Sequence, residues 1–178
     1  PEGMDAATAA LFPSTFKAPE LGLIPERWEV SSLGDQLEIL SAGTPKTKIP
    51  EYWDGEIPWF SVVDAPNEGQ VFVFDTERRI SQSGLENSPA RLMPTNTTII
   101  SARGTVGKLA LTGQPMAMNQ SCYGRRPADG VGEFSTYVSV QRFVTHLQRI
   151  AHGPVFDTIT RSSFSQAQAV NAPKDVVS

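Results

Sequence analysis

The feature that most constrains the fold is the β-branched run Thr97-Thr98-Ile99-Ile100, which is followed by a turn that contains two glycines. Side chains branched at Cβ fit a pleated and mostly buried strand better than a helix. Gly104 and Gly107 bracket the turn, where the backbone can take positive φ, and a strand pattern resumes over Val106–Leu111. We therefore predict a β-hairpin with three polar side chains near its tip: Arg103, Thr105 and Lys108.

Composition sets the size and class of the molecule. The chain has 178 residues, of which 39% are hydrophobic and 19% charged, and this length supports one domain, or one domain with a tail. No apolar run approaches the ~20 residues that cross a bilayer, so a cytoplasmic location is expected. One cysteine, Cys122, excludes an internal disulfide, and the two histidines have no zinc-ligand spacing. We expect no metal and no cofactor.

The fold class that these patterns predict is α+β, with β-rich mixed sheets and few helices. One long helix near 134–151 follows from apolar residues at i, i+3, i+4 and i+7. A strand is expected over Glu56–Val63, and a last strand near Ala169–Ala172. Two shorter helices are also expected: one over Leu33–Leu40, capped by Ser31 or Ser32, and one helical turn capped by Ser81 or Ser83 with Leu85 facing inward.

The first twenty residues differ from the rest of the chain. Asp5–Phe12 resembles the last turns of an alanine-rich helix that Pro13 ends, and Pro19 keeps the following segment extended. We therefore divide the chain into residues 1–20, a helix end plus linker, and residues 21–178, the folded domain.

Family resemblance appears when several short motifs are taken in order. These are Gly22-Leu-Ile-Pro25 with Trp28, Gly43-Thr-Pro45, Tyr52-Trp-Asp-Gly55 before Ile57-Pro-Trp59, Ser101-Ala-Arg-Gly-Thr-Val-Gly107, Asn119-Gln120, and Phe156 with Ile159, Phe164 and Pro173. Each motif is weak alone, but their order and spacing resemble the DNA specificity domain of type I restriction-modification systems. The resemblance covers about residues 21–173.

This resemblance implies binding rather than bond-making. Such a domain resembles one target recognition domain of a specificity subunit, which reads half of a split site in double-stranded DNA. Methylation and cleavage would belong to modification and restriction subunits, which are the implied partners together with DNA; no membrane is implied. Where family members usually show a double glycine, this chain has Ala42-Gly43.

Candidate DNA contacts are chosen by residue type and loop position, because Lys and Arg meet phosphates and Arg pairs with guanine. The first group is Lys46, Lys48, Arg103, Thr105 and Lys108, and the second is Arg125, Arg126, Ser163 and Gln166. Asn119 and Gln120 belong to the shared motif and are expected to be structural. The formal charge of −4 counts against a nucleic-acid binder, so local clustering of charge must compensate.

Three other interpretations remain open at this point. An enzyme is disfavoured, because no nucleophile-base constellation or nucleotide-binding glycine fingerprint is present. A protein- or carbohydrate-binding module is the main alternative, with Tyr52, Trp53 and Trp59 exposed along a cleft. The third is the same fold bound mainly to protein partners.

The role of Asp64 is also open. It can cap a helix, hydrogen-bond within a turn or take part in a reaction.

Overall fold

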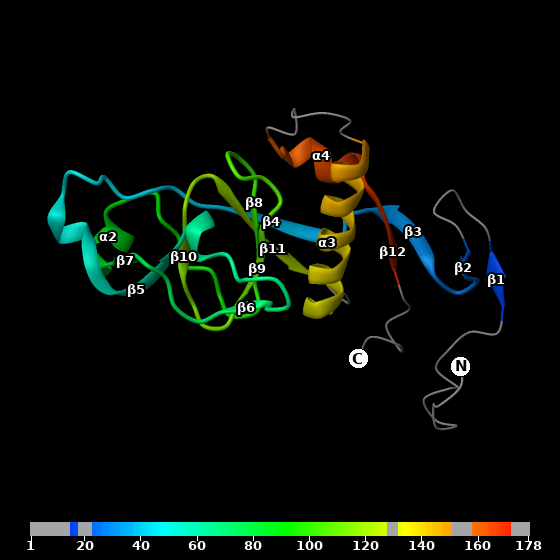
Figure 1. The fold of residues 1–178 in the computed structure, drawn as a ribbon, viewed down its shortest axis with the longest axis horizontal. Helices are drawn as coiled ribbons and strands as arrows, with labels where there is room; N and C mark the ends of the chain where they lie inside the picture. The colour runs from blue at the N-terminus through cyan, green and yellow to red at the C-terminus, as the bar shows by residue number, and fades with distance from the viewer. Residues whose placement is uncertain (1–14, 18–22, 128–131, 151–157, 172–178) are drawn as a thin grey trace, which may run out of the picture.

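The computed structural model describes residues 15–17, 23–127, 132–150 and 158–171. A five-stranded sheet in the order β4-β11-β8-β9-β6 forms the centre (Figure 1). Its strands are β4 Leu37–Ser41, β6 Phe72–Val73, β8 Thr98–Ser101, β9 Leu109–Thr112 and β11 Cys122–Pro127. Antiparallel pairs join β4, β11, β8 and β9, whereas β6 runs parallel to β9. The sheet is therefore mixed, as predicted.

The predicted hairpin is confirmed. Strands β8 and β9 pair with Ile99 opposite Ala110 and Ile100 opposite Leu109. Ile100 packs in the cluster beneath the long helix, whereas Ile99 packs in a second cluster on the other face of the sheet, with Met116 and Met118. Both isoleucines are fully buried, which explains why this strand is apolar without alternation.

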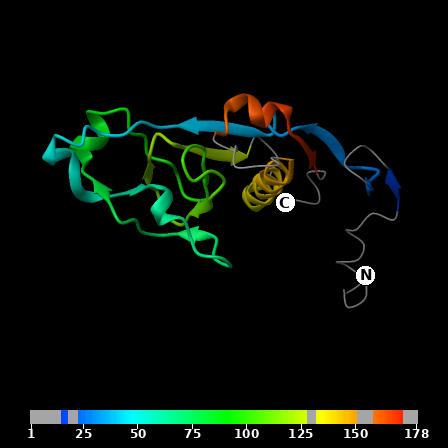
Figure 2. The same ribbon diagram turned by 45° about the horizontal axis from the view of Figure 1, so that its top comes forward.

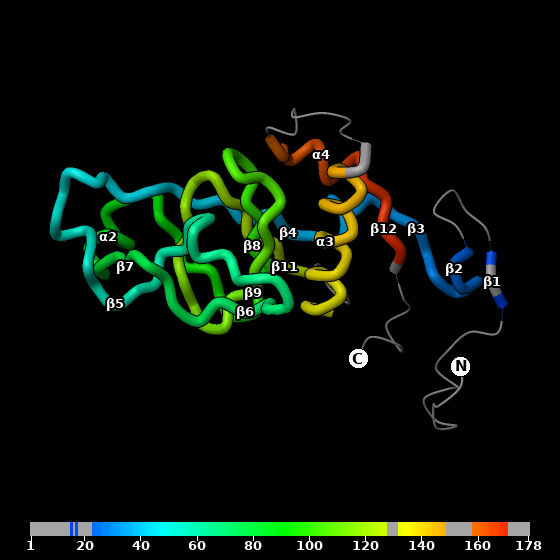
Figure 3. Tube along the Cα trace, in the orientation of Figure 1, coloured from blue at the N-terminus to red at the C-terminus, as the bar shows by residue number. Residues whose placement is uncertain are grey.

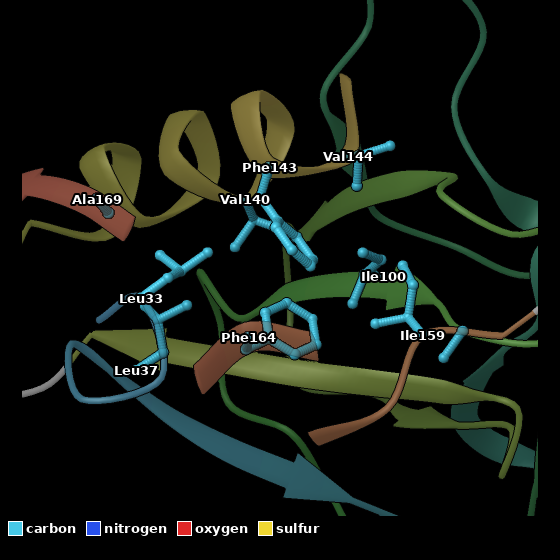
Figure 4. Close-up of a cluster of buried hydrophobic side chains, with 10 residues drawn as sticks. Leu33, Leu37, Ile100, Val140, Phe143, Val144, Ile159, Phe164 and Ala169 are labelled. Carbon is cyan, nitrogen blue, oxygen red and sulfur yellow. The ribbon is translucent and has the colours of Figure 1, made fainter. Parts of the chain in front are cut away.

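The long helix is also confirmed: α3 spans Glu133–Ile150. It contacts β8 and β11, and Figure 2 shows it beside the sheet and nearly end-on. Figure 4 shows Val140 and Phe143 of α3 directed toward Phe164, which belongs to α4 Arg161–Gln166. The Phe143 and Phe164 ring centroids lie 4.7 Å apart. This cluster joins α3, α4 and the central sheet in one core.

A second group of strands forms the far end of the molecule. It contains β10 Ala117–Met118, β5 Trp53–Phe60 and β7 Arg79–Ile80, in that order, with the short helices η1 Pro50–Tyr52, η2 Val62–Asp64 and α2 Gln82–Glu86 nearby. The tube in Figure 3 shows the connection from β4 to η1 extending from the central sheet to this end. Trp53, Trp59 and Ile80 form its core, with Leu85 packed against them as predicted.

Two two-stranded sheets complete the fold. Strand β3 Glu29–Ser32 pairs with β12 Gln168–Asn171, which confirms a closing strand near the expected position. Strand β1 Phe16–Lys17 pairs with β2 Ile24–Pro25, so part of the predicted linker takes part in a sheet. The predicted helix over Asp5–Phe12 lies outside the described residues.

The helix predicted over Leu33–Leu40 is wrong. Its residues form the turn after β3 and most of β4, and all of β4 pairs with β11, from Leu37 opposite Pro127 to Ser41 opposite Tyr123. Leu33 and Leu37 are both buried, which matches helical spacing, but the turn between them brings both into the same core. Sheet pairing with a distant strand has overridden the local pattern.

The other short elements are resolved as follows. Ser81 caps α2, with its side chain accepting a hydrogen bond from Gly84 N at 3.0 Å. The Glu56–Val63 strand begins earlier, at Trp53, and ends at Phe60, because Val62–Asp64 forms the 3₁₀ helix η2. Asp64 caps that helix: its Oδ2 accepts from Ser61 N at 2.7 Å, and its Oδ1 accepts from Glu77 N at 2.7 Å. Asp64 is thus a structural cap.

Candidate nucleic-acid interface

Two exposed loops carry most of the predicted contacts. We call residues 42–49 the Lys46 loop and residues 102–108 the β8–β9 turn. Lys46 and Lys48 are exposed on the first, and Arg103, Thr105 and Lys108 are exposed on the second. In Figure 1 the Lys46 loop, in cyan, and the β8–β9 turn, in green, both lie on the upper side of the molecule, as does α4.

The β8–β9 turn is shaped by the buried Ser101 and by two glycines. Ser101 Oγ accepts from Lys108 N at 2.9 Å and donates to Thr105 O at 2.6 Å, so one hydroxyl closes the turn. Gly104 and Gly107 have φ of 73° and 89°, which L-residues with side chains rarely adopt. The sequence analysis allowed positive φ at these glycines, and both adopt it. Arg103, Thr105 and Lys108 are therefore presented on a fixed backbone.

A third segment lies next to this turn. Arg103 forms an antiparallel bridge with Thr158, and Ile159 N donates to Ala102 O at 2.9 Å. Thr160 then caps α4, and Arg161 Nη2 donates to Ser41 Oγ at 3.3 Å, at the end of β4 and next to the Lys46 loop. Arg161 is exposed beside the predicted contacts. The sequence analysis selected Ser163 and Gln166 from this segment but not Arg161.

Two weaker candidates lie on α4. Ser163 and Thr160 cap the helix reciprocally. Ser163 N donates to Thr160 Oγ1, and Ser163 Oγ accepts from Thr160 N at 3.1 Å. The side chain of Ser163 is therefore already engaged, whereas Gln166 is exposed at the helix end. The serine-rich composition concealed this helix, although Thr160 and Ser163 have capping-box spacing.

Arg125 and Arg126 are neighbours in β11 with different surroundings. Arg126 is half-buried opposite Glu38, but Arg125 is fully buried with 0% of its surface exposed. The Arg125 guanidinium carbon lies 3.3 Å from the centre of the Phe164 ring, and burial lowers its pKa to about 9. Arg125 therefore lies inside the protein, and we leave it out of the surface that we consider for DNA.

The aromatic residues of the alternative interpretation are also not where that interpretation needs them. Trp53 and Trp59 are 8% and 4% exposed and pack edge to face, with ring centroids 5.2 Å apart. They form a core, not the wall of a cleft.

Exposed aromatic rings gather elsewhere: Phe72 contacts Phe74 and Phe134 with centroids 5.9 and 6.1 Å apart. In Figure 1 their elements, β6 and the start of α3, lie on the lower side, opposite the cationic loops.

Groups that could support other chemistry are shielded. Burial, with a smaller contribution from Asp64, raises the pKa of the Cys122 thiol to about 12. Asn119 Oδ1 accepts from Ser121 N at 2.7 Å, so Asn119 shapes the turn before β11.

Two further kinds of feature are absent from the described ranges. No group of three or more His, Cys, Asp and Glu side chains there is arranged to hold a metal ion. None of the helices placed in the structure combines the length and apolarity that crossing a bilayer requires.

Comparisons with known proteins agree with the resemblance seen in the sequence. The specificity subunit of the type I restriction enzyme MjaIX from Methanocaldococcus jannaschii is 30% identical over 155 residues, covering 86% of this chain and 36% of the relative. The HindI specificity subunit from Haemophilus influenzae is 24% identical over 157 residues, covering 86% and 34%. The chain thus spans about a third of the length of these curated relatives.

Solved structures share the fold. The HsdS subunit from Thermoanaerobacter tengcongensis matches with a TM-score of 0.65 at 18% identity, over 90% of this chain and 37% of that one. A chain from a study of complex assembly in a type I R-M system matches with a TM-score of 0.64 at 19% identity, over 94% and 38%. Residues 25–175 match the family described as type I restriction modification DNA specificity domain, and the chain belongs to that family.

Proposed function

We propose that this chain is a target recognition domain that reads one half of a split duplex DNA site for a type I restriction-modification complex. The observation that carries this proposal is the placement of charge: Lys46, Lys48, Arg103 and Lys108 are exposed on loops fixed to a buried scaffold. The tryptophans that a ligand-binding module would expose are buried instead. Family membership supports the same function.

The proposed contacts divide by chemistry. Lysine and arginine neutralise phosphates, and an arginine that reaches a guanine edge adds ~1–3 kcal/mol of discrimination. The first-ranked residues are Lys46, Lys48, Arg103, Thr105 and Lys108, with Arg126, Ser163 and Gln166 as secondary candidates. The domain has no catalytic role in this proposal and needs no cofactor.

Sequence specificity would reside in the variable loops. Gly104, Gly107 and Asn119 set backbone shape, and features shared by domains that read different sequences cannot specify one of them. Loops on a rigid scaffold can change in sequence without loss of the fold. The base sequence recognised is therefore a property of loop side chains.

The wider assembly is also part of the proposal. Modification subunits would supply methylation and, through them, the restriction subunit would supply cleavage, in the cytoplasm. Residues 1–20 would connect the domain, residues 21–178, to a preceding spacer helix. With a formal charge of −4 the isolated domain should bind DNA weakly, so high affinity requires linked sites elsewhere in the complex.

The experiment that tests this function is a genome-wide methylation map of the host with and without the full-length gene. We expect a split motif, with a fixed gap between two short half-sites, to lose methylation when the gene is deleted. Exchanging only residues 21–178 for the same region of a relative should change one half-site and leave the other. A map unchanged by deletion would refute the proposal.

The loops are tested in the assembled complex with a double variant, Lys46→Ala with Arg103→Ala. Each phosphate contact contributes ~0.9 to the slope of log affinity against log salt, so this slope should fall by ~1.8. Lys17→Ala with Arg142→Ala is the matched control, because both residues are exposed cations outside the two loops. Equal slopes for the wild type and the loop variant would show that other residues contact DNA.

A further inference from the structure

Arg78 is an exposed cation that is fixed by an aromatic ring. Its guanidinium carbon lies 3.6 Å from the centre of the Trp53 ring and 5.5 Å from that of Trp59. Arg78 is exposed, whereas Trp53 is 8% exposed, so a solvent-facing cation rests on a nearly buried indole. A guanidinium stacked on an aromatic ring loses less conformational freedom when it forms a further contact.

The same indole also contacts the Lys46 loop. Trp53 Nε1 donates to Lys46 O at 3.2 Å. The ring therefore fixes the backbone of Lys46 along its edge and the guanidinium of Arg78 over its face. Arg78 and Lys46 are 32 positions apart in the numbering but share one support.

The backbone of Arg78 is fixed as well. Its carbonyl oxygen accepts from Trp59 N at 3.0 Å and from Thr76 Oγ1 at 2.6 Å. The preceding residue, Glu77, donates its N–H to the cap Asp64 at 2.7 Å. Both ends of the Arg78 side chain are thus held before any ligand binds.

The neighbouring arginine provides a natural contrast. Arg79 Nη2 lies 2.8 Å from Asp75 Oδ1, and Arg79 Nη1 lies 4.0 Å from Glu56 Oε2 and donates to Glu56 O at 3.0 Å. The Thr76 amide and then Arg79 lower the pKa of Asp75, which keeps that carboxylate charged. Arg79 is neutralised, whereas within the described ranges no carboxylate lies at ion-pairing distance from Arg78.

From this arrangement we infer that Arg78 contacts a phosphate of the DNA backbone next to the Lys46 loop. The inference rests on the proposed function and assigns a contact that sequence reasoning did not select. A side chain that contacts a base edge must extend away from the protein into a groove of the DNA. The Arg78 guanidinium instead lies against the protein, stacked on the Trp53 ring. That geometry suits an anion at the surface, and phosphates supply such anions at regular spacing along a duplex.

The test measures binding of the assembled complex to two duplexes over a range of salt, one with the motif found by the methylation map and one without it. Arg78→Ala should lower the salt slope by ~0.9 on both duplexes, because a phosphate contact carries no sequence information. Arg79→Ala should leave both slopes unchanged. Arg78→Lys should keep the slope but weaken binding severalfold, because lysine keeps the charge without the planar stack.

The outcomes separate this inference from the proposed function. Unchanged slopes for Arg78→Ala in a complex that binds DNA would overturn the inference alone, as would an equal fall for Arg79→Ala, which would indicate net charge only. A fall confined to the motif-containing duplex would also overturn it, because that result describes a base contact. A wild-type complex that does not bind DNA would overturn both.

Discussion

The Lys46 loop and the β8–β9 turn both present exposed cations, but different forces hold them in place. The Lys46 loop is fixed by a side chain, the Trp53 indole, through its Nε1–H bond to Lys46 O. The β8–β9 turn is fixed by backbone conformation and by one buried hydroxyl, that of Ser101. The first support should therefore fail when a ring is removed, and the second when a backbone angle is changed.

The largest expected effect comes from removing the ring. Trp53→Ala should lower the free energy of unfolding by ~3–5 kcal/mol, because a nearly buried indole leaves a cavity. Arg78 would lose its stack at the same time, and the Lys46 loop its hydrogen bond. Chemical denaturation of the domain measures this loss.

A conservative variant keeps the prediction specific. Trp53→Phe retains a ring under Arg78 but removes the bond to Lys46 O, so it should cost less stability than Trp53→Ala. If Trp53→Ala cost under ~1 kcal/mol, well below the usual range for such truncations, the indole would not be the support of the Lys46 loop.

A smaller effect is expected from the glycines of the other region. Both glycines have positive φ, 73° at Gly104 and 89° at Gly107, which strains a residue with a side chain. A Cβ added to Gly107 would also lie 2.8 Å from Val144 Cγ1, whereas a Cβ added to Gly104 would meet no atom within 4 Å. Gly104→Ala should therefore cost ~1–2 kcal/mol of stability from backbone strain alone. Gly107→Ala should cost at least ~1 kcal/mol more than Gly104→Ala, because the Val144 side chain or the turn must also shift.

The two glycine variants also differ in what they should do to DNA binding. Displacement from α3 moves the turn that carries Arg103 and Lys108, so Gly107→Ala should weaken binding more than Gly104→Ala does. Denaturation and salt-dependent binding on the same two proteins check this. Equal losses of stability would show that the contact with Val144 has no energetic consequence.

Sequence patterns predicted the regions in which local and tertiary preferences agree. The Thr97–Ile100 run favoured a mostly buried strand over a helix, and the apolar spacing near 134–151 predicted α3 within one residue at each end. Leu33 and Leu37 were misassigned because one burial pattern fits both a helix and a strand-turn-strand segment. Only the distant partner, β11, distinguishes the two.

The functional surface was less predictable than the fold for a related reason. By residue type alone, Arg78, Arg103, Arg125 and Arg161 are equal candidates for DNA contact. Only tertiary packing shows that Arg78 is exposed on an indole, whereas Arg125 is buried beneath a helix. Arg125 follows Tyr123 by two positions in β11 and so faces the same side, the core beneath α3 and α4. The alternation of side chains along β11 could have indicated that Arg125 is buried, but the bounds of the strand were not known from the sequence.

The smallest effect on DNA binding is expected at Arg125, because this residue is buried whereas the cations of the two loops are exposed. Arg125→Met should leave affinity and salt slope unchanged, whereas Arg126→Met, on the opposite face of the same strand, should lower the slope if Arg126 meets DNA. At neutral pH, Arg125→Met should be as stable as the wild type or up to ~1–4 kcal/mol more stable, because the buried Arg125 guanidinium has no hydrogen-bond partner among the described residues.

The pH dependence of Arg125→Met has a definite sign. Burial lowers the pKa of Arg125 from 12.5 to about 9, so above pH ~9 the folded wild type releases a proton that the unfolded chain still holds. The unfolded state then binds more protons, and the contribution of Arg125 to stability rises with pH. Any advantage of Arg125→Met should therefore shrink as pH rises from 8 to ~10 in paired denaturation experiments. A gap that stays constant over this interval would mean that the folded protein keeps Arg125 protonated up to pH ~10, because the folded and unfolded states would then bind the same number of protons.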